Sequence, residues 1–377
     1  MMNPIYLDYN ASTPIAPAVR DAMMPYLAGI FGNPSSSHAF GREAREGIET
    51  ARKRVAALLG CDAAEIIFTS GATESNNMVL LSAAAQAGEK SRIITSAIEH
   101  PAVLEPCRFL EQQGHHVTYL PVDRSGMVDP QDLEKALTKG AALVSIMHAN
   151  NEVGTLQPVA DLARMAAARK APFHTDAAQT VGKVRCRVDE LGVDFLTIAG
   201  HKFYAPKGVG ALYIRKGRKL SPLLHGAGHE QGLRPGTENL ASIAGLGKAC
   251  EIAGPVIEAE CLRQAQLGRR LFDGLRQAGF SVHLNGHPEK KLPNTWNISF
   301  EGFDAPAVMA ALDAVAVSPG AACHGSSVTM SHVLEAMGVP KKLARGAIRF
   351  SLGRETTEQE IDYVLAMLKE KLYLHKQ

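Results

Sequence analysis

The sequence has little that would tie it to a membrane, a nucleic acid or an export route. Its 377 residues carry a formal net charge of +2, too small to indicate a nucleic-acid or membrane-binding surface. No uninterrupted apolar run reaches the roughly 18 residues of a membrane span. Residues 1–6 lack the basic and apolar regions of a secretion signal. We therefore expect a cytoplasmic protein with no membrane partner and no direct nucleic-acid partner.

Cysteine is also scarce, and its spacing argues against two kinds of site. The six cysteines form no C-x-x-C pair, so free thiols in a reducing compartment fit better than a disulfide framework or a zinc site. His115 and His116 are adjacent, and in a strand they would point to opposite faces. We predict no metal site. The cysteines are Cys61, Cys107, Cys186, Cys250, Cys261 and Cys323.

The chain is long enough for two domains. A hydrophobic content of 46% with a mean hydropathy near zero is typical of a soluble globular protein with a large core. The length exceeds that of one compact domain, and the sequence contains no internal repeat or low-complexity linker. We predict a large domain over residues 15–255 and a small domain over residues 1–14 and 256–377.

Short β-rich runs alternate with helical stretches between about residues 65 and 215. This alternation predicts an α/β domain with a mostly parallel sheet, in which ligands bind at the carboxyl ends of the strands. After about residue 255 the pattern changes to a smaller α+β domain. The expected strands are 65–69, 92–95, 117–120, 143–147, 172–174, 195–198, 211–214, 281–284, 296–300 and 347–351, and the expected helices include 101–113, 258–278, 305–312 and 358–371.

A lysine and an acid follow two of these strands. Lys202 lies in Gly200-His201-Lys202-Phe203, just after the strand 195–198, and Asp176 lies at the end of another strand. An enzyme that uses pyridoxal 5'-phosphate (PLP) needs such a pair, because the lysine forms the Schiff base and the acid keeps the pyridine nitrogen protonated. Gln179, one helical turn on, could bond the phenolic oxygen. Without that context, Asp176 could equally cap a helix.

Two further segments fit the same cofactor. Gly71, Ala72 and Thr73 form a turn between a strand and a helix, where the first helical N–H groups could face a phosphate. The alternative for this turn is an ordinary helix cap. His100 stands just past the strand 92–95, where its ring could stack on the cofactor and move protons. A lone histidine is more often structural, but its place at a strand end favours the functional interpretation.

Together these motifs resemble the cysteine desulfurase family, a branch of the fold-type I PLP enzymes close to the class V aminotransferases. The resemblance runs nearly end to end. It implies a PLP-dependent enzyme that converts L-cysteine to L-alanine and transfers the sulfur, as a persulfide on an enzyme cysteine, to an acceptor such as an iron–sulfur scaffold protein. The matching segments are 7–14, 31–36, 71–75, 148–152, 174–179, 200–202, 234–237 and 349–354.

The resemblance also implies roles for single residues. Lys202 matches the Schiff-base lysine, and His100 matches the stacking histidine. Asn151 matches the asparagine near the phenolic oxygen and the substrate amine. Arg349 matches the arginine that clamps the substrate carboxylate, a task that suits a guanidinium fork. Thr237 matches a residue that reaches the phosphate of the neighbouring subunit, which implies a homodimer.

One position departs from the family pattern. Many members carry serine two residues before the His-Lys pair, where it bonds the phosphate, and this chain has Ala199. His201, Thr73 and backbone amides must then hold the phosphate. We expect somewhat looser cofactor binding.

Cys323 matches the position of the family's catalytic cysteine, which lies on a mobile loop. It stands in a segment of small residues, 318–327, beside His324. A cysteine that attacks substrate sulfur must be exposed and have a lowered thiol pKa, to which a protonated His324 could contribute. Without the resemblance, a single cysteine is more often a buried apolar residue.

Three alternatives remain open at this point. Selenocysteine lyase is a close relative that resembles this chain over 194–204 and 234–239, and a selenol, as a better leaving group, would demand less of Cys323. The loop length from Cys323 to residues 331–334 favours the desulfurase. A plain aminotransferase would not need Cys323. A catalytically idle scaffold would need neither Lys202 nor Asp176.

Overall fold

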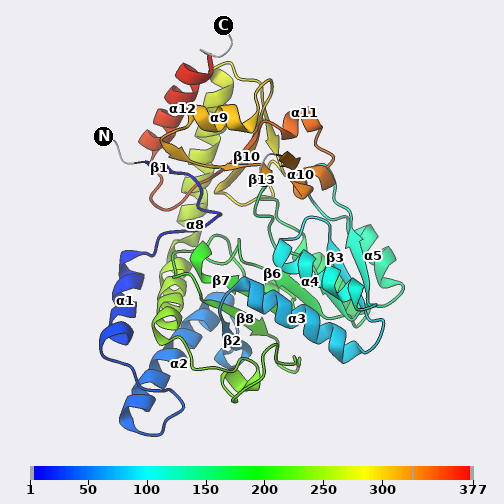
Figure 1. Cartoon of the computed structure of the whole chain (residues 1–377), viewed down its shortest axis with the longest axis vertical. Coiled ribbons are helices and arrows are strands. Elements are labelled where there is room, and N and C mark those ends of the chain that lie inside the picture. The colour runs from blue at the N-terminus through cyan, green and yellow to red at the C-terminus, as the bar shows by residue number, and fades with distance from the viewer. Residues whose placement is uncertain (1–3, 325–326, 374–377) are drawn as a thin grey trace.

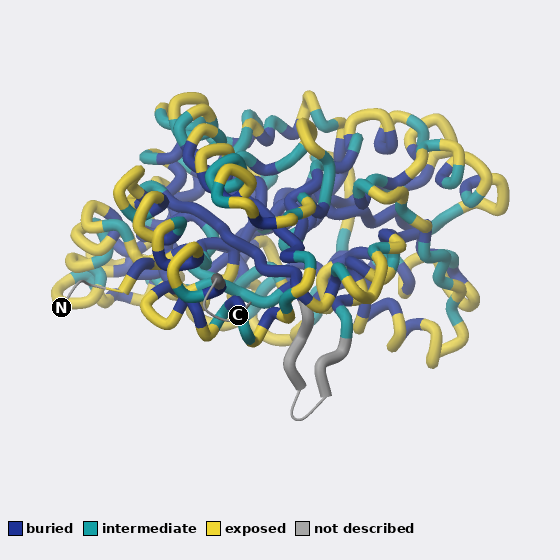
Figure 2. Tube along the Cα trace, turned by 90° about the horizontal axis from the view of Figure 1, so that it is seen from above, coloured by how far each residue is buried: buried dark blue, intermediate teal, exposed yellow. Residues whose placement is uncertain are grey.

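The computed structural model describes residues 4–324 and 327–373, and the side chains of 321–324, 327–329 and 373 lie outside that description. The chain forms a larger part around a seven-stranded sheet and a smaller part that contains β1 and α12 (Figure 1). Buried segments lie mostly in the interior, and exposed segments lie mostly on the outside (Figure 2). This arrangement confirms the predicted α/β class.

The central sheet has the strand order β2-β8-β7-β6-β5-β3-β4. Neighbouring strands are parallel except where β8 pairs with β2 and β7, so the predicted, mostly parallel sheet is confirmed. The bounds are β2 (Ile66–Thr69), β3 (Arg92–Ser96), β4 (His116–Leu120), β5 (Leu143–Ser145), β6 (Phe173–Asp176), β7 (Phe195–Ala199) and β8 (Gly210–Ile214).

Helices cover both faces of this sheet, because successive strand residues point to opposite sides. Ile66 and Phe68 belong to one apolar cluster, and Ile67 between them belongs to another. The helices of this part are α1 (Pro17–Ala28), α2 (Ala39–Leu59), α3 (Ala72–Ala87), α4 (Pro101–Gln112), α5 (Pro130–Leu137), α6 (Val159–Ala168) and α7 (Val188–Leu191), with short 3-10 turns η1 (Ala63–Glu65), η2 (Gly200–Lys202) and η3 (Glu230–Gly232).

Helix α8 (Leu240–Gln277) connects the two parts, and the prediction that a helix starts at Glu258 was wrong. The proline at 255 removes one N–H, but the turns before it are buried, with Leu246 and Ala253 fully enclosed. By length and composition α8 could cross a membrane, yet 56% of its most apolar window is buried inside the protein, as expected of a core helix. The predicted domain boundary after residue 255 falls within α8, and the boundaries stay a prediction.

The smaller part has its own sheet and core. Its strand order is β12-β15-β10-β9, with antiparallel neighbours, and β1 pairs in parallel with β11. Leu271 of α8 packs here against aromatic side chains such as Phe300 and Phe350. The elements are β1 (Ile5–Tyr6), β9 (Val282–Asn285), α9 (Ala305–Ala311), β10 (Thr295–Phe300), β11 (Val315–Ala316), β12 (Ser318–Pro319), β15 (Ala347–Ser351) and α12 (Glu358–Tyr373).

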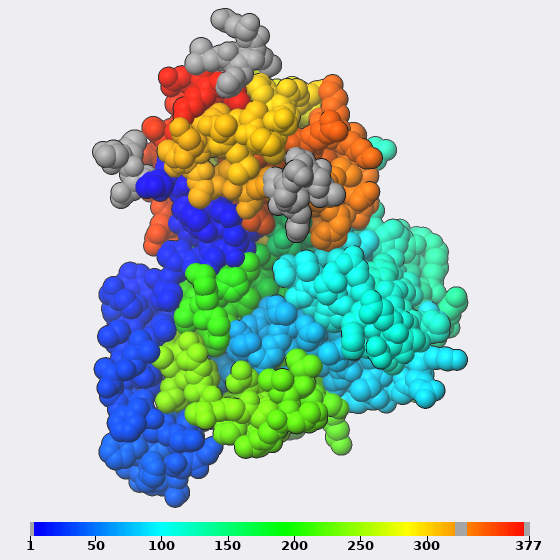
Figure 3. Space-filling model, viewed as in Figure 1, coloured from blue at the N-terminus to red at the C-terminus, as the bar shows by residue number. Residues whose placement is uncertain are grey.

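Two chain segments cross between the parts. The N-terminal segment, blue in Figure 3, runs along one side of the larger part and reaches the smaller part, where Leu7 exchanges backbone hydrogen bonds with Ala316 and Ser351. The second segment lies between β12 and β15. It contains the hairpin of β13 (Ala321–His324) and β14 (Ser327–Met330), then α10 (His332–Ala336) and α11 (Lys341–Ala344).

Candidate active site

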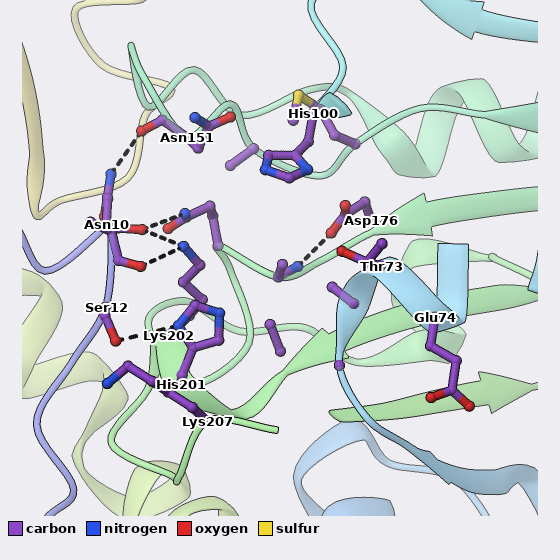
Figure 4. Close-up of a pocket in the computed structure, with 18 of the residues that line it drawn as sticks. Asn10, Ser12, Thr73, Glu74, His100, Asn151, Asp176, His201, Lys202 and Lys207 are labelled. Carbon is purple, nitrogen blue, oxygen red and sulfur yellow. Dashed lines mark hydrogen bonds between the residues drawn. The ribbon is translucent and has the colours of Figure 1, made fainter. Parts of the chain in front are cut away.

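A pocket of about 520 Å³ opens at the carboxyl ends of the central strands. Strands β2, β3, β5, β6 and β7 all end shortly before residues that line it, while the N-terminal segment and β15 close the opposite side. The labelled side chains around the pocket come from these different elements (Figure 4). The structure brings together ten of the twelve predicted site residues, namely Gly71, Ala72, Thr73, His100, Asn151, Asp176, Gln179, His201, Lys202 and Arg349.

Lys202 is held at the end of β7 by the turn η2. Its Nζ donates to the backbone oxygens of Asn10, at 2.7 Å, and Ala11, at 2.9 Å. Burial and the neighbouring Arg349 lower the pKa of Lys202 to about 8, although the carboxylate of Asp176 opposes them. The amine can therefore lose its proton close to neutral pH, as a nucleophilic or basic lysine must.

Asp176 is a buried carboxylate at the end of β6. Its Oδ2 accepts from the side-chain amide of Asn76 at 2.7 Å, and its Oδ1 accepts from the N–H of Ala178 at 2.9 Å. No cationic side chain forms a salt bridge with Asp176 among the residues that the structure describes. The negative charge at the pocket wall is thus fixed in place and available to a positively charged ligand group.

The start of α3 forms an open cradle beside Asp176. Gly71, the residue before the helix, has φ of 152°, and a Cβ added there would meet no atom within 4 Å. Among the described residues no side-chain cap occupies the start of this helix, and Gly71, Ala72 and Thr73 line the pocket. Gly210 allows close packing behind this turn, because a Cβ there would lie 2.7 Å from the Gly71 Cα. Such a helix start suits an anion.

Two histidines line the pocket in neutral form. His100 caps α4, and its Nδ1 accepts from the N–H of Ala102 at 3.0 Å, so Nε2 carries the ring proton. Burial lowers the pKa of His100. Burial and the nearby lysines Lys202 and Lys207 also lower the pKa of His201, to about 4. His201 lies beside the buried Ala199, the position at which many relatives of the predicted family carry serine.

Arg349 and Asn151 form the opposite wall. The Arg349 guanidinium donates to the Asn151 backbone oxygen at 3.1 Å, to Asp8 at 2.7 Å and to Ser318 at 3.0 Å. Its Nε is buried without a partner among the described residues. The arginine is therefore neutralised by Asp8 at the pocket wall.

Sequence reasoning missed the residues that support this wall from behind. The Asn10 side chain bonds Thr295 at 2.8 Å, and its backbone oxygen accepts from both Lys202 and Gln179. Lys183 donates to Asn10 at 2.9 Å and to Gln179 at 2.8 Å, and burial lowers its pKa strongly. The available signals were the place of Asn10 in the segment 7–14 and the spacing of Lys183, four residues after Gln179.

The two remaining predicted site residues are Thr237 and Cys323. Thr237 is exposed in the segment before α8. Cys323 lies in β13, where its backbone pairs with Val328 of β14, and its side chain lies outside the described part of the chain. Over the described residues 4–324 and 327–373, no group of three or more His, Cys, Asp or Glu side chains is arranged to hold a metal ion.

Comparison with known proteins gives consistent matches. The family model described as aminotransferase class-V matches residues 5–364. A protein named cysteine desulfurase IscS from Dictyoglomus turgidum is 51% identical over 372 residues, which cover 98% of this chain and 94% of that protein. A solved NifS-like protein has a TM-score of 0.93 at 40% identity, and the match covers 98% of this chain and 100% of that protein's chain. A structure of SspA in complex with cysteine has a TM-score of 0.82 at 39% identity, and the match covers 92% of this chain and 98% of that protein's chain.

Proposed function

Because the chain belongs to the class-V aminotransferase family and, within it, to the cysteine desulfurases, we propose that it converts L-cysteine to L-alanine with PLP as cofactor. The sulfur passes to Cys323 as a persulfide and then to an acceptor protein, such as an iron–sulfur scaffold. One observation carries the proposal: Lys202, Asp176 and the uncapped start of α3 converge on a single pocket.

The residues of the pocket fit this cofactor. The start of α3, with Thr73 and His201 as further donors, suits the phosphate. Asp176 suits the protonated pyridine nitrogen, because it is a buried carboxylate with no salt bridge among the described residues. Gln179 and Asn151 lie on the side proposed for the phenolic oxygen. When bound, the cofactor supplies an aldehyde that captures amines and a ring that withdraws electrons from the substrate α-carbon.

Lys202 and His100 are the two groups that handle protons. Lys202 removes the proton from the substrate α-carbon, because its amine has a pKa of about 8 and is aimed by the carbonyls of Asn10 and Ala11. His100 presents Nε2 to the pocket, since Nδ1 is occupied by the cap of α4. It is placed to return a proton to the carbon fragment.

Arg349 binds the substrate carboxylate. The carboxylate competes with Asp8 and Ser318 for the guanidinium donors. Asn151, held to Arg349 through its backbone oxygen, lies where the substrate amine enters. The substrate is thereby held at both its carboxylate and its amine.

Cys323 receives the sulfur. Its thiolate attacks the substrate sulfur, a sulfur–sulfur bond forms, and the bond between Cβ and sulfur breaks with its electron pair left on carbon. Protonation of that carbon, together with return of the α-proton, yields alanine. The relative from Dictyoglomus turgidum is named a cysteine desulfurase, which favours L-cysteine over the L-selenocysteine alternative.

The wider setting completes the proposal. We place the enzyme in the cytoplasm as a homodimer, with the exposed Thr237 available to the partner subunit's phosphate site. Neither a membrane nor a nucleic acid is a direct partner in this account.

Sulfide and alanine release from L-cysteine, in the presence of a thiol reductant, tests this function. The account predicts both products in equal amounts, and their loss in Cys323→Ala. Selenide release from L-selenocysteine, run in parallel, is the comparison. If selenocysteine turns over while cysteine acts only as an inhibitor, the desulfurase assignment fails.

A further inference from the structure

The hairpin that contains Cys323 joins the rest of the fold through two short segments, which we call its feet. The first foot, residues 318–320, pairs with β15, so that Ser318 lies opposite Arg349. The Ser318 hydroxyl donates to Asp8 at 2.9 Å and accepts from Arg349 at 3.0 Å. The N–H of Gly320 donates to the Ala347 oxygen at 2.7 Å. This foot is therefore tied to the substrate-binding arginine.

The second foot, residues 331–332, is tied to the loops that follow β3 and β5. The Ser331 hydroxyl donates to the Glu152 carboxylate and accepts from the N–H of Val333 at 3.1 Å. His332 lies 3.0 Å, through Nε2, from the backbone oxygen of Glu99. Because a carbonyl only accepts, Nε2 carries the proton and donates. Both side chains of this foot are thus committed to partners outside the hairpin.

The partners of the second foot are next in sequence to pocket residues. Glu152 directly follows Asn151, and Glu99 directly precedes His100. Glu99 itself is fixed, because its Oε1 accepts from the Ser96 hydroxyl at 2.6 Å and from a backbone N–H at 2.9 Å. The second foot is therefore bonded to fixed points on the two loops that carry Asn151 and His100.

An apolar cluster supports these polar contacts. Val333 and Leu334, in the first turn of α10, are buried against Ile98, Met147 and Val153, which lie on the same two loops. The Ser331 hydroxyl also caps α10. The second foot therefore packs against this apolar cluster, and its contacts with Glu152 and Glu99 fix its orientation.

We propose that Glu152, Ser331 and His332 are positioning residues that hold the hairpin where Cys323 can reach the substrate sulfur. They act on the transfer of sulfur to Cys323 and leave proton removal from the substrate α-carbon unchanged. This inference rests on the proposed function, since it assigns these residues to the sulfur-transfer step described above.

The test compares two reactions of the PLP-loaded enzyme. Exchange of the alanine α-hydrogen with solvent deuterium, followed by NMR, needs Lys202 and the cofactor but not Cys323. Persulfide formation on Cys323 in a single turnover of L-cysteine, followed by mass spectrometry, needs Lys202, the cofactor and Cys323. For Ser331→Ala and His332→Gln we expect persulfide formation to slow about tenfold or more, with alanine exchange within about twofold of the wild type. Ser331→Thr keeps the hydroxyl and should restore the rate.

The smaller part offers a matched control. Ser281, directly before β9, and His283 of β9 both contact Glu301, at 2.8 Å and 3.3 Å, and none of the three lines the pocket. Ser281→Ala and His283→Gln remove the same groups and should leave both reactions unchanged. His332 is exposed, so His332→Gln keeps the fold even if Ser331→Ala does not.

The outcomes separate this inference from the proposed function. Unchanged persulfide formation in both foot variants, or an equal loss of both reactions, would overturn the positioning role. Absence of alanine exchange, or of persulfide, in the wild type would instead overturn the proposed function. Slower persulfide formation with normal alanine exchange supports both the positioning role and the proposed function.

Discussion

The two walls of the pocket are built in different ways. On the wall formed by the large sheet, Lys202 and Asp176 sit at the ends of buried strands and are held by groups such as the backbone of Asn10 and the amide of Asn76. On the opposite wall, Arg349 is held by an ion pair with Asp8 and by Ser318 of the first foot. The first wall presents fixed groups, whereas the second presents a cation whose partners a ligand can replace.

This difference separates two tasks. Groups at strand ends are already in position when a cofactor binds. They therefore suit charges that must stay in one place during the reaction. An arginine that exchanges Asp8 for a substrate carboxylate links substrate binding to Ser318 and thus to the hairpin. We therefore assign cofactor chemistry to the first wall and substrate and sulfur handling to the second.

Loss of the lysine on the first wall should have the largest effect. Lys202→Ala removes the group that we propose bonds the cofactor and moves the α-proton, so alanine formation should fall by about 10³-fold or more. The check is alanine release together with the absorbance of bound cofactor. The control is Lys139→Ala, which changes an exposed lysine outside the pocket. Near-normal turnover in Lys202→Ala would contradict the assignment of cofactor chemistry to the first wall.

Loss of the acid on the same wall should come next. Asp176→Ala removes the buried carboxylate that we propose faces the ring nitrogen, and it leaves the Asn76 amide without its acceptor. We expect turnover to fall by about 10²- to 10³-fold, the usual cost of removing one preorganised electrostatic group. Steady-state kinetics and cofactor retention on gel filtration measure this. An Asp176→Ala enzyme with full activity would show that the charge is only structural.

A change on the second wall should affect binding more than turnover. Arg349→Lys keeps the positive charge but loses the fork that holds a carboxylate, so the KM for L-cysteine should rise about tenfold while kcat changes little. Cofactor absorbance should stay normal. A large fall in kcat with unchanged KM would place Arg349 in the cofactor chemistry and erase the difference between the walls.

The pH dependence of cofactor capture should give the smallest effect. Burial lowers the pKa of Lys202 to about 8 in the cofactor-free protein, and only the neutral amine attacks an aldehyde. The rate at which added PLP develops its protein-bound absorbance should therefore rise with pH and level off above about 8. A rate that still rises steeply toward pH 10 would mean that Lys202 keeps an ordinary lysine pKa.

Much of the fold and of the pocket was predictable because it depends on local patterns. Strands such as Phe195–Ala199 are short apolar runs, and parallel strands place their carboxyl ends at one edge, so Lys202 and Asp176 were expected to meet. The start of α8 was missed, because the buried turns before Pro255 compensate for a residue that usually ends a helix.

The supporting contacts were not predictable in this way. The bond between Lys183 and Asn10 joins residues 173 positions apart, and that between Ser331 and Glu152 joins residues 179 apart. No periodicity or spacing records such pairs, since they exist only once the two parts of the chain have packed together. The N-terminal strand Ile5–Tyr6 was likewise unpredicted, because it pairs with a strand more than 300 residues away.

Single-turnover mass spectrometry on the PLP-loaded enzyme tests the central claim most directly. The wild type and Cys323→Ala are each mixed with L-cysteine, and the protein and the released amino acid are analysed. The account predicts one added sulfur atom on Cys323 and one alanine per site in the wild type, with neither in the variant, which still exchanges the alanine α-hydrogen. Alanine formation that persists in Cys323→Ala would contradict it.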